Sequence, residues 1–269
     1  MSKRVETYDA AYGNFSNKVS QEVRKEAFGD DIGQNSWITT DEFLRFLKHL
    51  GLKSTSNVLE IACGSGGPAL FIARTFGCHV TGIDINEKAI ATADKMTRDQ
   101  KLDSRVRFMK SDAGTALPFE SKTFDAIICI DAINHIPDRL RLLKESHRIL
   151  RAGGRLLFTD PVIVTGLISN EEIAVRSSVG FFLFSAPGED ERLIQASDFR
   201  LSNREDVTEN MSEMSKRRLD SREKHSRELI QIEGEETFKG TQRFFSMVHT
   251  LASERRLSRV AFVCEKIES

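Results

Sequence analysis

The segment Val58–Ala69 constrains the fold of this chain more than any other. It runs from an apolar stretch into Cys63-Gly64-Ser65-Gly66-Gly67-Pro68 and then into residues that favour a helix. Glycines in such a turn let the backbone bend tightly and approach a ligand, and the start of a helix points free N–H groups toward that ligand. The segment therefore predicts a strand, a ligand-binding turn and a helix, which together open an α/β sheet.

Short apolar runs alternate with amphipathic stretches from residue 57 to residue 160. This alternation is typical of successive βα units in a parallel sheet. We expect strands at Asn57–Ala62, His79–Asp84, Val106–Ser111, Phe124–Asp131 and Gly154–Asp160, and helices at Ala69–Arg74, Glu87–Asp99 and Arg139–Leu150.

The flanking regions add helices and two more strands. We expect helices at Thr7–Ala27, Thr40–Leu50, Glu189–Ala196 and Thr237–Arg255, a helix pair over Glu209–Glu233, and strands at Phe199–Val207 and Ser258–Lys266. The resulting prediction is one seven-stranded α/β sheet. Residues 1–56 form an N-terminal helical cap, residues 57–160 form the cofactor-binding core, and residues 161–269 complete the sheet, with helical substrate-cap insertions near 161–188 and 208–235.

Charge and cysteine content exclude several classes of function. Lys and Arg total 39 against 40 Asp and Glu, so the chain has no overall positive field to hold a nucleic acid. No apolar run approaches the ~18 residues of a membrane span, and the start is polar, so we expect a cytoplasmic protein with no membrane partner. The four cysteines lack metal-ligand spacing and are expected to be reduced, buried residues, with no metal site.

Acidic residues follow the glycine turn at informative positions. Asp84 ends the second strand about 20 residues beyond the turn, where a carboxylate can accept from ribose hydroxyls. At this point a nicotinamide dinucleotide and S-adenosylmethionine both fit. Glu60, just before the glycines, suits an ammonium group better than a pyrophosphate, and Asp112 after the third strand suits an adenine amino group.

These segments resemble the successive motifs of class I S-adenosylmethionine-dependent methyltransferases. The resemblance covers Glu60–Gly66, Asp84, Asp112 before Leu117-Pro118-Phe119, Phe124-Asp125-Ala126-Ile127 and Leu150–Gly154. It implies a Rossmann-like sheet with an antiparallel last strand and S-adenosylmethionine as cofactor. It also implies cofactor-binding roles: Glu60, Ala62, Gly64 and Gly66 would hold the methionine part, Asp84 the ribose, and Ile85, Asp112 and Ala113 the adenine.

The segment after the fourth strand carries the candidate catalytic residues Asp131 and His135. It lies at the carboxyl edge of the sheet, where open α/β folds bind ligands. The ordinary pKa of a histidine, near ~6.5, suits proton abstraction, and a carboxylate four residues earlier on a helical turn could orient the imidazole. Alternatively, His135 only packs or caps.

This segment also resembles the Asp-Ala-Ile-x-His run of phosphoethanolamine N-methyltransferases, in which the acid and the histidine form a catalytic pair. Phe28-Gly29-Asp30 and Trp37-Ile38-Thr39 are similar to the N-terminal segment of that group, which closes over cofactor and substrate. The resemblance implies cofactor contacts for Trp37 and for Thr39, whose hydroxyl would bond the cofactor carboxylate.

The aromatic composition indicates what kind of molecule would accept the methyl group. The chain has 18 Phe against 2 Tyr and 1 Trp, and no Tyr follows Tyr12, whereas the phosphoethanolamine group holds its phosphate with tyrosines beyond the fifth strand. Phe181-Phe182-Leu183-Phe184 and Phe244-Phe245 favour a largely apolar acceptor pocket, with core packing as the alternative. Lys216-Arg217-Arg218, interrupted by acids nearby, is expected to be a solvated face.

The sequence therefore predicts a methyltransferase acting on an N, O or C atom of a small molecule. Alternatives are an NAD(P)-dependent oxidoreductase on the same sheet and a non-catalytic module that binds the cofactor. We expect a monomer or a homodimer, with a small-molecule acceptor and no nucleic acid as partner.

Overall fold

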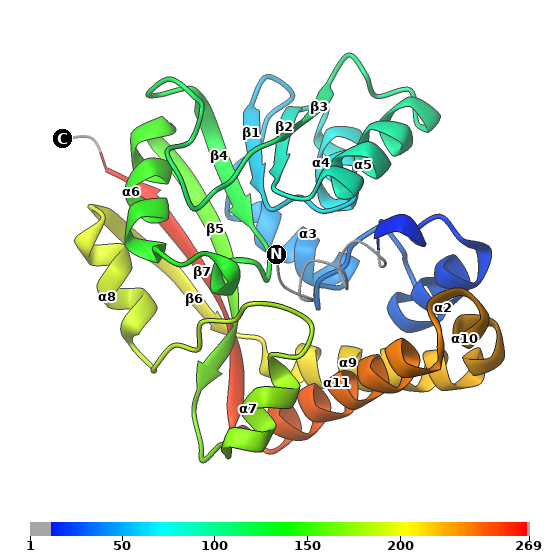
Figure 1. Cartoon of the computed structure of the whole chain (residues 1–269). Coiled ribbons are helices and arrows are strands. Elements are labelled where there is room, and N and C mark those ends of the chain that lie inside the picture. The colour runs from blue at the N-terminus through cyan, green and yellow to red at the C-terminus, as the bar shows by residue number, and fades with distance from the viewer. Residues whose placement is uncertain (1–11, 268–269) are drawn as a thin grey trace.

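A computed structural model describes residues 12–267 of the chain, which form a seven-stranded sheet in the order β3-β2-β1-β4-β5-β7-β6 (Figure 1). Strand β7 runs antiparallel to both of its neighbours, and the other pairs are parallel. The predicted α/β sheet with an antiparallel last strand is confirmed. The strands are β1 (Asn57–Ile61), β2 (His79–Asp84), β3 (Val106–Lys110), β4 (Phe124–Cys129), β5 (Leu150–Val164), β6 (Phe199–Asp206) and β7 (Leu257–Lys266).

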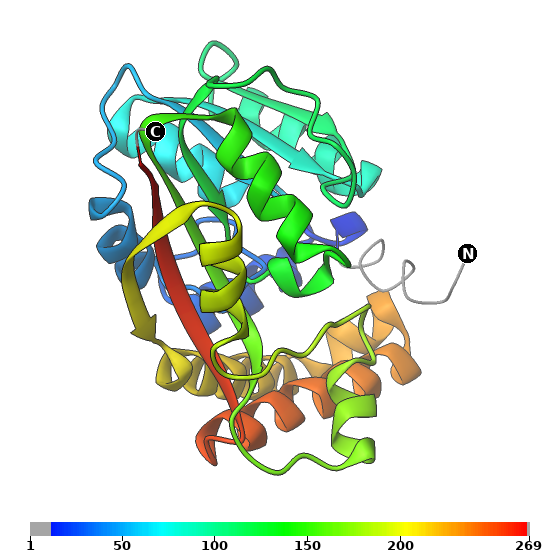
Figure 2. The same ribbon diagram turned by 90° about the vertical axis from the view of Figure 1, so that its left-hand side faces the viewer.

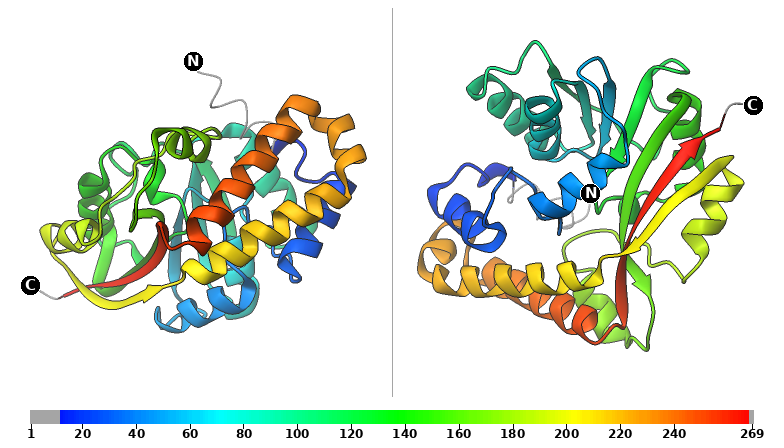
Figure 3. Two further views of the ribbon diagram at one scale, coloured as in Figure 1. Left: turned by 90° about the horizontal axis from the view of Figure 1, so that it is seen from below. Right: turned by 180° about the vertical axis from the view of Figure 1, so that it is seen from behind.

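Helices cover both faces of the sheet. On one face, α3 (Thr40–Lys48), α4 (Gly67–Phe76) and α5 (Glu87–Asp99) lie against the strands, with Phe43, Phe46 and Leu70 in the apolar cluster between them (Figure 3). On the other face lie α6 (Arg139–Ile149) and α8 (Glu189–Ala196), which Figure 2 shows in front of the sheet. This two-sided cover buries the apolar strands and leaves only the strand ends open to a ligand.

A third group of helices crosses the carboxyl ends of the parallel strands (Figures 1 and 3). It comprises α2 (Lys18–Phe28), α7 (Asn170–Arg176), α9 (Thr208–Lys224), α10 (Ser226–Glu233) and α11 (Glu235–Ser253). Helices α9 and α11 pack along each other, and α2 packs on α9. The predicted helical insertions are confirmed. Within residues 12–267, no helix has the length and apolar character needed to cross a membrane.

Three predicted boundaries were wrong for identifiable reasons. The predicted helix Thr7–Ala27 is interrupted: Tyr12 and Gly13 are helical, residues 14–17 form a turn, and α2 starts at Lys18, where the Asn17 side chain accepts from the Val19 amide. Residues 7–11 of the prediction lie outside the described residues. Strand β4 ends at Cys129, because the chain turns at Asp131 with a φ of 52°. Strand β5 continues through Pro161, which sits at a β-bulge where no ladder N–H is required.

The glycine turn between β1 and α4 contains two glycines with different tasks. Gly64 (φ 52°) lies at the cavity described below, and a Cβ there would lie 2.7 Å from the Tyr12 hydroxyl oxygen. A Cβ at Gly66 (φ 79°) would lie 2.4 Å from Phe108 Cζ and 2.9 Å from Ala93 Cβ. Gly66 therefore permits close packing of β3 and α5 against the turn.

We predict that Gly66→Ala destabilises the protein more than Gly153→Ala, by about 2 kcal/mol or more. Both positions have positive φ, but a Cβ at Gly153 would meet no atom within 4 Å, so this control isolates the clash with Phe108 and Ala93 from backbone strain. Chemical denaturation of the two variants measures the difference. Equal losses of stability would contradict the packing role of Gly66.

Candidate active site

A cavity of about 490 Å³ lies at the carboxyl ends of β1, β2 and β4. Five of the predicted cofactor residues line it together: Glu60, Ala62, Gly64, Asp84 and Ile85. They come from two strand ends and the glycine turn, and the parallel register brings Glu60 beside Gly82 and Ile61 beside Ile83. The topology therefore gathers side chains that are separated by about 20 residues of chain.

Glu60 is buried in the wall of this cavity, with 3% of its surface exposed. No hydrogen-bond donor among the described residues reaches its Oε2 atom. Burial raises the pKa of the Glu60 carboxyl to about 8, because the ionised form is poorly solvated there. A buried carboxyl oxygen with an open acceptor position suits a cationic group of a ligand, such as an ammonium.

Asp84 connects the end of β2 to the glycine turn. Its Oδ2 accepts from the Gly64 amide at 2.9 Å and its Oδ1 accepts from the Asn86 amide at 2.8 Å. A carboxylate has about four lone-pair positions, so it can still accept from ligand hydroxyls. Beside it, the Ile85 side chain is 62% exposed at the cavity, which gives a flat ligand an apolar surface.

Several predicted cofactor residues do not line this cavity. Gly66 serves packing, as described above. Asp112 is exposed beyond β3, where its Oδ1 accepts from the Gly114 amide, and Ala113 packs against the core under α6. The Thr39 hydroxyl caps α3 by accepting from Glu42 N at 3.3 Å, and Trp37 lines a second cavity. Cofactor contacts for these residues stay predictions.

The N-terminal segment reaches the first cavity through residues that the sequence did not single out. Gly33, Asn35 and Ser36 line it, and the Ser65 hydroxyl donates to Gly33 O at 3.0 Å. A Cβ at Gly67 would lie 2.4 Å from the Gly33 carbonyl, so this glycine lets the segment dock on the turn. Tyr12 also lines the cavity, although its sequence context indicated only a helix.

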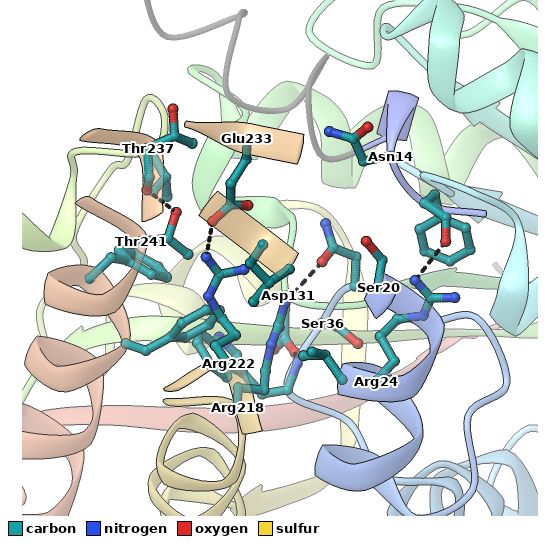
Figure 4. Close-up of a pocket in the computed structure, with 18 of the residues that line it drawn as sticks. Asn14, Ser20, Arg24, Ser36, Asp131, Arg218, Arg222, Glu233, Thr237 and Thr241 are labelled. Carbon is teal, nitrogen blue, oxygen red and sulfur yellow. Dashed lines mark hydrogen bonds and ion pairs between the residues drawn. The ribbon is translucent and has the colours of Figure 1, made fainter. Parts of the chain in front are cut away.

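A second cavity, of about 220 Å³, lies between the sheet edge and the capping helices (Figure 4). Its walls come from α2, α7, α9, α10 and α11 and from the N-terminal segment, including Trp37. Four residues line both cavities: Asn35, Ser36, Asp131 and His135. The two predicted catalytic residues therefore stand where the cavities meet.

Asp131 is held by donors from three parts of the chain. Its Oδ1 accepts from Arg259 Nε and from the Thr159 hydroxyl, both at 2.7 Å, and its Oδ2 accepts from the Trp37 amide at 2.9 Å. Arg259, fully buried on β7, also donates to Glu42 Oε2 at 2.7 Å. Sequence reasoning missed Arg259; the available signal was one arginine within the otherwise apolar stretch of the last strand.

His135 ends a short 3-10 helix, Ile133–His135, and is half-buried. Its Nδ1 lies 2.5 Å from the Phe181 carbonyl oxygen, which can only accept, so Nδ1 carries the hydrogen and Nε2 is the basic nitrogen. Burial lowers the pKa of His135, and the positive charge of Arg176 lowers it further. The neutral imidazole that a general base requires is thereby favoured.

The second cavity combines aromatic and cationic side chains. Phe182, Phe244 and Phe245 line it, whereas Phe184 packs in the core beside α11. The expectation that Lys216-Arg217-Arg218 is a solvated face was wrong for one residue. Lys216 and Arg217 are exposed, but Arg218 is half-buried and lines the cavity, because the turn of α9 places it toward Trp37 and Phe245.

Residues 59–158 match a family model described as a methyltransferase domain. This part of the chain is a methyltransferase domain. Its first curated relative is the 27-O-demethylrifamycin SV methyltransferase of Amycolatopsis mediterranei, which is 35% identical over 127 residues, covering 47% of this chain and 46% of the relative. The chain thus spans about half the length of the first curated relatives it matches.

Solved structures share the fold over almost the whole chain. The Haemonchus contortus phosphoethanolamine N-methyltransferase 2, in complex with phosphomonomethylethanolamine and S-adenosylhomocysteine, superposes with a TM-score of 0.81 at 22% identity, covering 97% of this chain and 60% of that one. The [4+2]-cyclase SpnF gives 0.77 at 21% identity, covering 98% and 95%. At these identities the likeness establishes the fold alone.

The described residues hold no cluster of three or more His, Cys, Asp or Glu side chains that could bind a metal ion. All four cysteines are buried, as expected for small apolar residues, and Cys63 forms part of the first cavity.

We predict that Glu60→Gln stabilises the unliganded protein increasingly as the pH rises. The unfolded pKa of a glutamate is about 4.3, and the folded pKa of Glu60 is about 8. Between these values the wild type keeps a proton only when folded, so it loses stability with rising pH by up to about 1.4 kcal/mol per pH unit. The neutral amide of the Glu60→Gln variant does not titrate, so the variant does not lose stability in this way.

Urea unfolding of both proteins at pH 5 and pH 8.5 measures this gain, with the exposed Glu120→Gln as control. The stability difference between Glu60→Gln and the wild type should be larger at pH 8.5. A difference that is the same at both pH values would show that Glu60 titrates normally.

Proposed function

We propose that this protein is an S-adenosylmethionine-dependent methyltransferase that transfers a methyl group to an N, O or C atom of a small molecule. One observation carries the proposal. A cavity lined by five of the residues expected for the cofactor and a second cavity meet at Asp131 and His135. Methyl transfer needs this arrangement, because donor and acceptor must be aligned within contact distance while the acceptor proton is removed.

The residues of the first cavity fit the proposed cofactor. The open Oε2 of Glu60 would accept from the ammonium of the methionine part, and Asp84 would accept from the ribose. Ile85 would pack on the adenine. When bound, the cofactor supplies a methyl group activated by a positively charged sulfur.

The chain itself contributes alignment and a base. His135 Nε2 accepts the proton that the acceptor atom loses, while the Phe181 carbonyl keeps Nδ1 protonated. Asp131, fixed by Arg259 and the Trp37 amide, places a carboxylate at the same junction. Capping helices around the second cavity exclude water, which would otherwise compete with the acceptor.

Two alternative functions stay open to test. A nicotinamide dinucleotide would bring its pyrophosphate to the glycine turn, where its negative charge would disfavour ionisation of the buried Glu60 carboxyl still further. The other alternative is a non-catalytic module that binds the cofactor. The fold is compatible with a role other than methyl transfer, since the [4+2]-cyclase SpnF shares it. Cytoplasmic location and a monomeric or homodimeric state stay predictions from the sequence.

We predict that S-adenosylhomocysteine binds the wild type saturably and binds Glu60→Gln about 10- to 100-fold more weakly, because a charge-assisted hydrogen bond to its ammonium is lost. Isothermal titration measures both affinities, with NADH as the competing ligand. Absence of heat at millimolar S-adenosylhomocysteine, or tighter binding of NADH, would contradict the proposed methyltransferase function.

We predict that His135→Ala lowers the rate of methyl transfer by about 10²- to 10⁴-fold with S-adenosylhomocysteine affinity unchanged, because only the base is lost. The wild type is first screened against a metabolite library by mass spectrometry for a gain of ~14 Da, because a CH₃ group replaces an H on the aligned acceptor and the net addition is CH₂. His49→Ala, on the exposed end of α3, is the matched control. Full activity of His135→Ala would show that His135 is not the base and only packs.

A further inference from the structure

The cavity proposed for the acceptor extends along helix α11. Thr237, Thr241, Phe244 and Phe245 all line it, and they recur at intervals of three or four residues, so they lie on one side of the helix. From Thr237 to Phe245 the helix rises about 12 Å, at about 1.5 Å per residue. These four residues form a stripe that is polar at the Thr237 end and aromatic at the Phe245 end.

The aromatic end of this stripe lies beside the junction of the two cavities. The Trp37 ring is 6.2 Å from the Phe244 ring, and the Trp37 amide donates to Asp131. Phe182 also lines the cavity, and its ring is 4.6 Å from the His135 ring. The part of a ligand that comes nearest to Asp131 and His135 is therefore surrounded by aromatic rings.

Two arginines at the aromatic end pack on these rings. Arg176 Cζ lies 4.5 Å from the ring centroid of Phe182, and Arg218 Cζ lies 4.5 Å from that of Phe245. The face of an aromatic ring stabilises a guanidinium placed over it. Arg218 also donates to Asn35 Oδ1 at 3.2 Å. Both cations are thus engaged within the wall of the cavity.

The opposite end of the stripe is polar and uncharged. Thr237 is exposed there, whereas Thr241, Asn14 and Ser20 are half-buried. Figure 4 shows Asn14 and Ser20 across the cavity from the two threonines. All four side chains carry a hydroxyl or an amide, which can donate and accept. The Thr241 hydroxyl donates to the Thr237 carbonyl at 2.9 Å, and its oxygen can still accept from a ligand.

The charged side chains near this polar end are already paired. Arg222 pairs with Glu233, and the two side chains are only 11% and 14% exposed. Arg24 Nε pairs with Asp31 Oδ2 at 3.0 Å, and Arg24 Nη1 donates to the Phe15 carbonyl at 2.9 Å. A charged group of a ligand would lose water at this position and would have to compete with these pairs. An uncharged polar group meets no such cost.

We propose that the acceptor is an elongated, uncharged molecule. It places a ring that bears the reacting atom in the aromatic end of the stripe, and it extends a hydrogen-bonding group to Thr241 and Thr237. The proposal rests on the proposed function and specifies its substrate class. A short acceptor would leave the polar end of the cavity unfilled, and an acceptor with a charged far end would disturb the ion pairs beside it.

Four phenols with different para substituents test this proposal. Para-(hydroxyhexyl)phenol has a ring and a chain long enough to follow the stripe. Para-(carboxypentyl)phenol and para-(aminohexyl)phenol carry a charge in place of its terminal hydroxyl, and para-ethylphenol lacks the long chain. Each is titrated into the full-length protein saturated with S-adenosylhomocysteine. Trp37 is the one tryptophan of the chain and lines the cavity, so its fluorescence reports binding there.

We expect para-(hydroxyhexyl)phenol to bind at least about fivefold more tightly than either charged analogue, because its end group forms a hydrogen bond without dehydrating a charge. Thr241→Val keeps the shape of the side chain and removes its hydroxyl. It should weaken binding of this phenol about threefold to tenfold and leave binding of para-ethylphenol within about twofold. Thr250→Val is the matched control, since Thr250 is a half-buried threonine of the same helix that lines a separate cavity.

A variant at the aromatic end tests the orientation of the bound molecule. Phe244→Leu should weaken binding of the long and the short uncharged phenol by a similar factor, about threefold or more, because the two share the ring. Loss of affinity for the long phenol alone would place its chain beside Phe244 and would overturn the proposal. Thermal unfolding of each variant is recorded, and Thr241→Val tests the proposal independently at a half-buried position.

The outcomes separate this inference from the proposed function. Equal or tighter binding of a charged analogue, equal effects of Thr241→Val and Thr250→Val, or binding of none of the four phenols at millimolar concentration would overturn the elongated, uncharged acceptor. In each of these cases, binding of S-adenosylhomocysteine would leave the methyltransferase intact. Failure of S-adenosylhomocysteine to bind the wild type would overturn both.

Discussion

The arrangement of the site depends on the ion pairs that the buried guanidinium of Arg259 forms with Asp131 and Glu42. This guanidinium joins three elements that are far apart in the chain: β7, the turn after β4 through Asp131, and α3 through Glu42. Burial raises the pKa of Glu42 even beside this cation, which shows how dry the cluster is. Removing one member of such a cluster leaves an uncompensated charge, so its parts constrain one another strongly. The cluster fixes Asp131, and Asp131 in turn holds the Trp37 amide, so the N-terminal segment is positioned by the last strand of the sheet.

A second charged cluster holds the insertion between β5 and β6. Arg139 Nη1 lies 2.6 Å from Asp160 Oδ2 and 2.9 Å from Asp190 Oδ1, and Arg139 Nη2 donates to the Leu183 carbonyl at 2.7 Å. The Leu183 amide donates to Asn134 O at 2.8 Å, next to His135. The loop that fixes the tautomer of His135 is therefore held two residues beyond Phe181, by both the amide and the carbonyl of Leu183. The base owes its orientation to residues outside its own 3-10 helix.

The sequence predicted local units better than their meeting points. The strand, glycine turn and helix from Val58 onward, the acid of Asp84 and the alternation of the core all follow from short-range patterns, and the seven strands follow one another along the chain as predicted. Long-range pairing has no such pattern. Nothing in residues 131–135 indicates that Arg259 binds Asp131 or that Phe181 binds His135. The cap that Thr39 gives to its own helix was likewise not foreseen, and its predicted cofactor contact stays a prediction. Arg218 was expected in solvent because its neighbours are charged, whereas the rotation of about 100° per residue along a helix turns it to another face than Arg217.

The second cavity is lined almost entirely by residues outside the part of the chain that matches the domain family. Of the residues that line it, only Asp131 and His135 lie within residues 59–158, the part that matches the domain family. Among the described residues, all others belong to the N-terminal segment, to the end of β5 or to the loops and helices after β5. Such positions can change with little cost to the sheet, whereas the glycine turn cannot. Relatives that share the domain can therefore differ completely in what they modify, and new acceptors can be sought by exchanging α7, α9 and α11 on an unaltered core.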